Sequence, residues 1–166
     1  GARRNEMGGS AYYRDVLGVT GTQPLTVDFE QEQKDMHAVA AVLKEGLVEA
    51  CHDISDGGLL VAAAEMLFTH RRPVELGLTI DLFGDLYIEL DTFLFSESGG
   101  FILEMTPENE DRVMTILKQN GAVAKRLGSV TDDAKIRVKH NVVNILESDI
   151  KVLLYKWFQG LEEGAI

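Results

Sequence analysis

The fold of this chain is decided by one stretch, His52-Asp53-Ile54-Ser55-Asp56-Gly57-Gly58-Leu59. Alternating residues over 48–54 predict a short strand, and an apolar run over 57–69 predicts a helix that follows after two or three residues. This run has almost no polar face, so we expect the helix to be buried on more than one side. Main-chain amides at such a helix start, beside glycines that permit close approach, can bind an anion.

The polar residues of this stretch permit two interpretations. The first is a phosphate-binding site built from His52, Asp53, Ser55, Asp56, Gly57 and Gly58. In that site Asp53 or Asp56 would hold a Mg²⁺ ion that bridges a phosphate. In the second interpretation Ser55 and Asp56 are ordinary helix caps, and His52 is a strand histidine with a backbone partner. The pattern is neither a Walker loop nor a Rossmann fingerprint, and no Lys follows the glycines, so spacing leaves both interpretations open.

A second glycine-rich stretch, Phe95-Ser96-Glu97-Ser98-Gly99-Gly100, precedes a strand predicted at 101–105. Its small residues would let a ligand approach the backbone, and Glu97 can accept hydrogen bonds from a sugar hydroxyl or an amine. Glu97 and Ser98 are therefore further candidates for substrate binding. The alternative is a glycine turn that leads into a core strand.

The remaining elements are predicted from periodicity and caps. Helices are expected after Ser10, from Asp28 to Gly46, after Pro107 as far as Gly121, and at the C-terminus over 150–161. Strands are expected over 76–80, 122–130, 135–139 and 142–146, whereas 83–100 shows no clear element.

The helix that begins at Asp28 is expected to present one apolar face and one solvated face. Its predicted apolar stripe consists of Phe29, Met36, Val39, Ala40, Leu43 and Leu47. Its predicted solvated face carries Glu30, Glu32 and Asp35. Together these elements predict an α+β fold, a layered α/β/α domain with a mixed sheet. We expect one domain over 10–166, with 1–9 as a linker that continues from a preceding segment.

Composition excludes several classes of function. The chain of 166 residues carries 16 Lys and Arg against 27 Asp and Glu, a formal net charge of −11, which disfavours nucleic-acid binding. No apolar run approaches the length of a membrane span. A single cysteine, Cys51, favours a reducing, cytoplasmic location. The histidines His37, His70 and His140 share no metal-ligand spacing, so neither a metal site nor a catalytic residue is assigned.

Three motifs in this order carry a resemblance to a known family: Asn5-Glu6-Met7-Gly8-Gly9-Ser10-Ala11-Tyr12-Tyr13, the stretch 52–59 and the stretch 95–100. The chain resembles the C-terminal domain of the aminoimidazole-ribonucleotide-synthetase-related superfamily. Within that superfamily it is most similar to the large subunits of phosphoribosylformylglycinamidine synthases. The resemblance covers about residues 5 to 160, and it implies the fold of that C-terminal domain.

The resemblance also implies a ligase of purine biosynthesis. Enzymes of this family use ATP to activate the amide oxygen of formylglycinamide ribonucleotide, and ammonia from glutamine then displaces phosphate to form the amidine. ATP and Mg²⁺ would be bound mostly by the N-terminal half of the subunit, so this chain alone should be inactive. The implied partners are that N-terminal half, a glutaminase subunit, a small accessory subunit and the ribonucleotide substrate.

One departure from the family pattern keeps alternatives open. The family's substrate-binding copy continues the Ser-Glu-Ser motif with a Gln and a basic residue, whereas Gly99-Gly100-Phe101 follows here. This chain would then line a second, non-productive nucleotide site or act as a non-catalytic scaffold. A domain of a sister enzyme, such as selenophosphate synthetase or thiamine-monophosphate kinase, is a further alternative, although Cys51 lies in the wrong context for the former.

Overall fold

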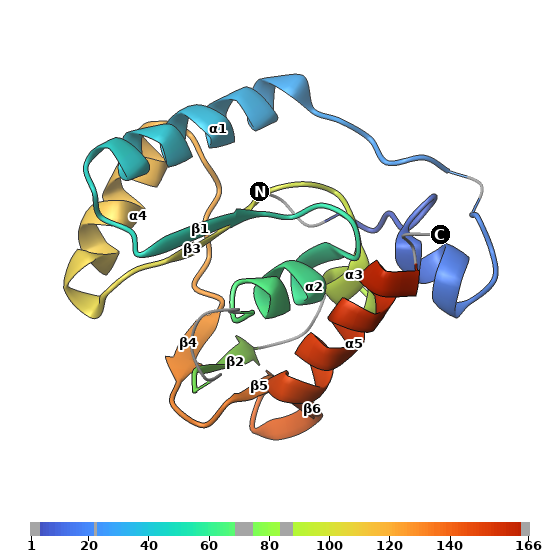
Figure 1. The fold of residues 1–166 in the computed structure, drawn as a ribbon. Coiled ribbons are helices and arrows are strands. Elements are labelled where there is room, and N and C mark those ends of the chain that lie inside the picture. Colours follow the sequence, from blue (N-terminus) through green and yellow to red (C-terminus); the bar gives the residue numbers. More distant parts are fainter. Residues whose placement is uncertain (1–3, 22, 69–74, 84–87, 164–166) are drawn as a thin grey trace. The chain divides into compact units, whose positions relative to one another are not determined.

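The computed structural model describes residues 4–21, 23–68, 75–83 and 88–163, and they divide into two compact units (Figure 1). The first unit comprises Gly1–Ala62 and Ile88–Lys125, and the second comprises Ala63–Tyr87 and Arg126–Ile166. The division falls within helix α2 (Gly58–Glu65). Within the described ranges, no helix has the length and apolar character needed to cross a bilayer.

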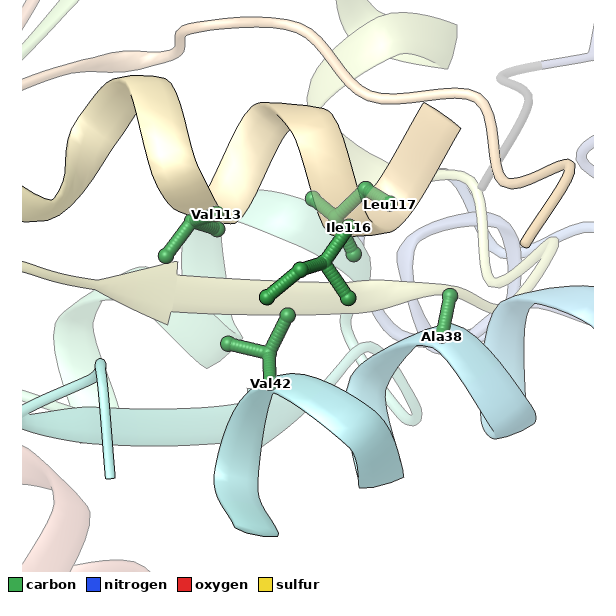
Figure 2. Packing of buried hydrophobic residues seen from close by; sticks show 5 residues of the cluster. All are labelled: Ala38, Val42, Val113, Ile116 and Leu117. Carbon is green, nitrogen blue, oxygen red and sulfur yellow. The ribbon is translucent and has the colours of Figure 1, made fainter. Parts of the chain in front are cut away.

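The first unit is built on an antiparallel pair, β1 (Ala50–Asp53) and β3 (Phe101–Glu104), which run side by side in Figure 1. Helices α1 (Phe29–Lys44) and α4 (Glu110–Gln119) pack together beside these strands. Figure 2 shows the side chains of the two helices pointing toward one another. The fully packed cluster consists of Ala38, Val42, Val113, Ile116 and Leu117.

Helix α1 begins where the sequence predicts, but it buries a different face. The Asp28 carboxylate caps it by accepting a hydrogen bond from the Gln31 amide at 3.1 Å. The predicted apolar stripe is largely exposed, with exposed fractions of 81% for Phe29, 58% for Met36 and 48% for Leu43. Of this stripe, Val39 is buried as predicted. The buried face is formed by smaller side chains, including Ala38 and Val42, because these let α1 approach α4 closely.

The predicted solvated face of α1 is also wrong in two places. Asp35 is only 3% exposed, and its Oδ1 accepts a hydrogen bond from the Gln31 side-chain amide at 3.0 Å. Glu32 is half-buried, and its carboxylate lies beside Gly99. Asp35 can be buried in the first unit because Gln31 supplies a hydrogen bond to its carboxylate.

Three further local predictions need correction. The stretch 83–100, for which no element is expected, contains a helix, α3 (Leu90–Phe95), whose residues Thr92, Phe93 and Leu94 are buried. The helix expected over 57–69 ends at Glu65, although residue 69 lies outside the described residues. The helix after Ser10 is a short π-helix, η1 (Tyr12–Val16), and the helix after Thr106 starts with a 3₁₀ turn, η2 (Pro107–Asn109).

The second unit has a four-stranded mixed sheet in the order β4-β2-β5-β6. Its elements are β2 (Gly77–Leu82), β4 (Gly128–Thr131), β5 (Lys135–His140), β6 (Val143–Asp149) and helix α5 (Ile150–Glu163). The β2–β5 pair is parallel and the other two pairs are antiparallel, which confirms the predicted α+β class with a mixed sheet. The strand expected over 122–130 forms only at its C-terminal end. The strand expected at 101–105 pairs with β1 in a separate sheet.

One face of this sheet carries a network of ion pairs. The Arg137 guanidinium lies 2.6 Å from Asp133 and 2.7 Å from Glu147, and the Lys135 ammonium lies 2.8 Å from Glu147. The hydrogen bond from Arg137, together with one from Thr131, lowers the pKa of Asp133 to about 2. Hydrogen bonds from Lys135 and Arg137 likewise lower the pKa of Glu147. These carboxylates therefore favour the folded second unit as long as they are ionised.

We predict that Asp133→Asn destabilises the second unit at neutral pH and not at strongly acidic pH. The Asp133 contribution is fully present above its ordinary pKa of 3.8 and is lost as the pH falls toward about 2. Trp157 packs against Phe158 and Phe68 within this unit, so its fluorescence reports urea unfolding there. The gap between the unfolding midpoints of wild type and variant should close between pH 5 and pH 2, about the range set by the shifted pKa.

The matched control is Asp132→Asn, at the exposed neighbouring position. This variant should unfold like the wild type throughout the titration. A gap for Asp133→Asn that does not change with pH would contradict the assigned ion pair.

Candidate functional site

The three motifs that carry the family resemblance meet within the first unit. The Tyr12 ring of the first motif stacks on Phe95 of the third, with ring centroids 4.5 Å apart and planes inclined by 6°. The Ile54 amide of the second motif donates to the Gly100 carbonyl at 2.8 Å, which extends the β1–β3 pairing by one residue. Segments far apart in the sequence therefore form one junction, which we call the three-motif junction (residues 7–13, 52–58 and 95–100).

Glu97 lies at the centre of this junction. Its Oε1 accepts a hydrogen bond from the Gly57 amide at 2.8 Å and another from the Ala11 amide at 2.8 Å. The sequence predicts that Glu97 would accept hydrogen bonds from a ligand, whereas this oxygen is used by the main chain of the protein itself. Hydrogen bonds from amides to an ionised carboxylate are stronger than those between neutral groups.

The two glycines at the start of α2 are required by the backbone and by close packing. Gly57 has φ +80° and Gly58 has φ +73°, in the left-handed region that side chains rarely adopt. A Cβ atom on Gly58 would lie 2.6 Å from the Phe95 carbonyl carbon. The Gly58 amide donates to the Ser55 carbonyl at 3.0 Å, so the amides of both glycines have partners inside the first unit.

The remaining candidates of the second motif point outward. Asp53, Ser55 and Asp56 are exposed, and His52 is half-buried, with its Nδ1 2.6 Å from the Asp53 carbonyl oxygen. This backbone contact is what the second interpretation expects of a strand histidine. The proposed phosphate site is thus divided into an exposed set of carboxylate and hydroxyl groups and an internal set of glycine amides.

Ser98 and Ser10 occupy different positions in the junction. The Ser98 hydroxyl oxygen is shielded from solvent and has no hydrogen-bond partner within the described residues. Ser10 is fully buried, and its hydroxyl oxygen lies 2.7 Å from the Met7 carbonyl and 3.3 Å from the Tyr13 amide. The Ser10 hydroxyl thus caps the first turn of η1, as its position in the sequence predicts.

Arg14 is a charged neighbour of the junction that the sequence analysis does not single out. Its guanidinium is hydrogen-bonded to Asp15 at 2.7 Å, which raises the pKa of Arg14, and Glu97 and Asp56 add to this effect. Arg14 therefore lies within electrostatic reach of two acidic residues of the junction, Glu97 and Asp56. The sequence feature that could have pointed to Arg14 is its position directly after the first motif, together with its charge, which is opposite to that of Glu97 and Asp56.

The described residues do not form a metal site of their own. No group of three or more His, Cys, Asp or Glu side chains among them is placed to hold a metal ion. Asp53 and Asp56 alone therefore do not fit a Mg²⁺ site, and no chemical step of this chain is derived through one. Cys51 is exposed as a residue, but partial desolvation of its thiol and the nearby Asp53 charge raise the thiol pKa. The thiol is therefore not activated as a nucleophile.

The fold and the three motifs define a class of protein. Residues 2–141 match the family model described as AIR synthase related protein, C-terminal domain. The chain belongs to this family.

The curated relatives are more specific. The chain is 33% identical over 99% of its length to "Phosphoribosylformylglycinamidine synthase subunit PurL" of Methanothrix thermoacetophila. It is 37% identical over 93% of its length to "Probable phosphoribosylformylglycinamidine synthase, chloroplastic/mitochondrial" of Arabidopsis thaliana. The chain spans only 21% of the first relative and 11% of the second.

Solved structures of T. maritima PurL share the fold. The structure complexed with FGAR matches 89% of this chain and 27% of its own chain, with a TM-score of 0.71 and 20% identity. A structure of PurL complexed with ATP also matches 89% of this chain and 24% of its own, with a TM-score of 0.66 and 21% identity. A structure of PurLQS matches the same share of each chain, with a TM-score of 0.66 and 20% identity.

We predict that Gly58→Ala destabilises the first unit more than Gly46→Ala does. Both glycines have positive φ, but a Cβ at Gly46 meets nothing within 4 Å, whereas one at Gly58 meets the Phe95 backbone at 2.6 Å. The control variant should lose about 1 kcal/mol through backbone strain, and Gly58→Ala should lose about 1–3 kcal/mol more. Urea unfolding followed by far-UV circular dichroism measures both losses. Equal losses would show that Gly58 does not touch Phe95.

Proposed function

We propose that this chain is a domain of the large subunit of a phosphoribosylformylglycinamidine synthase, an ATP-dependent ligase of purine biosynthesis. The observation that carries the proposal is the 33% identity to a PurL subunit over 99% of the chain. The junction supports it, because the motifs on which the resemblance rests are packed together in the first unit. We further propose that residues 10–166 act as one domain of that subunit.

The geometry suggests how the domain would contribute to the reaction. In the full-length enzyme ATP activates the amide oxygen of formylglycinamide ribonucleotide, and ammonia from glutamine displaces the phosphate. The exposed side chains of Asp53, Ser55 and Asp56, with His52 beside them, are available to face such a ligand. The internal groups, which are Gly57, Gly58 and Glu97, would hold the loop in shape. Ser98 would lie beside Glu97 in the adjoining segment.

ATP and Mg²⁺ would be held mostly by parts of the subunit outside this chain. Two observations support this division: the described residues lack a metal cluster of their own, and the amides of Gly57 and Gly58 already have internal partners. The relative whose structure contains ATP is also several times longer than the matched segment. By itself, therefore, this chain should not catalyse phosphoryl transfer.

The partners and location follow the same proposal. A glutaminase subunit would supply ammonia, and a small accessory subunit would join the assembly. The solved PurLQS structure supports the expectation of further subunits. A cytoplasmic location remains the prediction made from the single cysteine.

A second candidate function is a non-catalytic scaffold domain of the same subunit. The observation that favours it is the carboxylate of Glu97 on the Gly57 amide, because an internal anion already occupies the donor that a phosphate would need. In this case Asp53 and Asp56 would be solvated surface residues without a ligand.

We predict that the double variant Asp53→Asn/Asp56→Asn lowers amidation by the full-length subunit at least about tenfold, as expected when charged ligand contacts are removed. Both side chains are exposed, so the fold should be retained, which circular dichroism verifies. The control is Asp132→Asn, an exposed acid in the second unit, which should leave the rate unchanged. An unchanged rate in the double variant would favour the scaffold role over the ligand-facing role.

A further inference from the structure

Glu97 brings together two main-chain donors that are distant in sequence. Ala11 lies 86 residues before it and Gly57 lies 40 residues before it, yet both amides donate to the same carboxylate oxygen at 2.8 Å. Glu97 itself is held between the buried Ser96 and the buried Gly100. Its backbone therefore cannot move far without disturbing the core of the first unit.

Both donors lie at the start of a helix. Ala11 directly precedes η1, and Gly57 directly precedes α2. Amide hydrogens at helix starts have no partner within their own helix and carry partial positive charge, which favours an anion. One negative charge thus satisfies the beginnings of two helices at once.

Besides Glu97, the two helix starts share a neighbour, Phe95. On the N-terminal side, the first motif is held by the buried Ser10 hydroxyl and by stacking of Tyr12 on Phe95. On the other side, the loop is shaped by the positive φ of Gly57 and the close approach of Gly58 to Phe95. Glu97 is bonded to both sides.

We propose that Glu97 acts as a built-in anion that couples the order of the N-terminal segment 7–13 to the order of the loop 53–58. Loosening either segment then loosens the other, because each bond to the carboxylate helps to hold the oxygen in place for the second. Arg14, on η1, is within electrostatic reach of both Glu97 and Asp56 and carries the opposite charge. The exposed Ser55 and Asp56 therefore take their position partly from a segment more than 40 residues earlier in the chain. This coupling goes beyond the proposed function and does not depend on it.

Amide hydrogen exchange of the chain, resolved by NMR, tests the coupling without any activity assay. Glu97→Gln keeps the size of the side chain and one acceptor oxygen but removes the charge. Exchange at Ala11 and Gly57 should both accelerate about tenfold, as expected for the loss of a charge-assisted hydrogen bond. The matched control is Glu89→Gln, an exposed acid whose side chain does not cap α3. This control variant should leave the exchange rates of the Ala11 and Gly57 amides unchanged.

A second variant separates coupling from simple loss of structure. Ser10→Ala removes the cap of η1, and the two hydroxyl bonds that it deletes, to Met7 and Tyr13, lie within the N-terminal segment. It should accelerate exchange at Gly57 about threefold when Glu97 is present and add nothing in the Glu97→Gln background, which is the signature of interacting positions. Amides of Val113 and Ile116 in α4 report whether the unit remains folded.

The outcomes are distinguishable from one another. Unchanged exchange at either amide in Glu97→Gln overturns the proposal, and so does an effect of Ser10→Ala on Gly57 that is equal in both backgrounds. If Glu97→Gln also accelerates exchange of the α4 amides, the first unit has lost structure, and the single variant Ser10→Ala then provides the test. Acceleration at Gly57 with α4 still protected then supports the coupling, and no acceleration overturns it.

Discussion

The first unit depends on a negative charge that lies inside it. One oxygen of Glu97 receives the amides of Ala11 and Gly57, and these two bonds join three segments that have no sequence continuity. Other contacts between these segments include the stack of Tyr12 on Phe95 and the main-chain bond from Ile54 to Gly100. The carboxylate adds what those contacts lack, because it compensates the partial charges at two helix starts with a single group.

This internal charge changes how a phosphate motif should be interpreted. A strand, a glycine turn and an apolar helix together offer amides that can hold an anion, but here the protein supplies the anion for Gly57 itself. The groups left at the surface are Asp53, Ser55 and Asp56, which would need a cation or a hydroxyl-bearing ligand rather than a bare phosphate. Under the proposed function, this domain would complete a site that is built mainly elsewhere in the large subunit.

Much of this architecture could be predicted from local patterns. The Asp28 and Ser10 caps, the strand before residue 54 and the mixed sheet follow from residue types and short spacings, which act over a few positions. The buried face of α1 could not be predicted, because apolar residues lie on both of its faces. The choice between them depends on how closely α4 can approach Ala38 and Val42.

Helix α3 and the division of the candidate site residues could not be predicted from local patterns either, for different reasons. Helix α3 has six residues, and the glycines and acidic residues on either side of it interrupt any periodic signal. The eight candidate site residues do lie close along two segments of the junction, but the division into exposed and internal groups rests on Glu97. Its partners are 40 and 86 residues away, so no spacing rule connects them.

The most direct measurement is a crystal structure of the proposed full-length large subunit, determined with ATP and Mg²⁺ bound. The account predicts that Glu97 still accepts the amides of Ala11 and Gly57, while the nucleotide or substrate is approached only by the exposed groups of the loop. A Gly57 amide bonded to a phosphate oxygen, with the Glu97 side chain turned away, would contradict it.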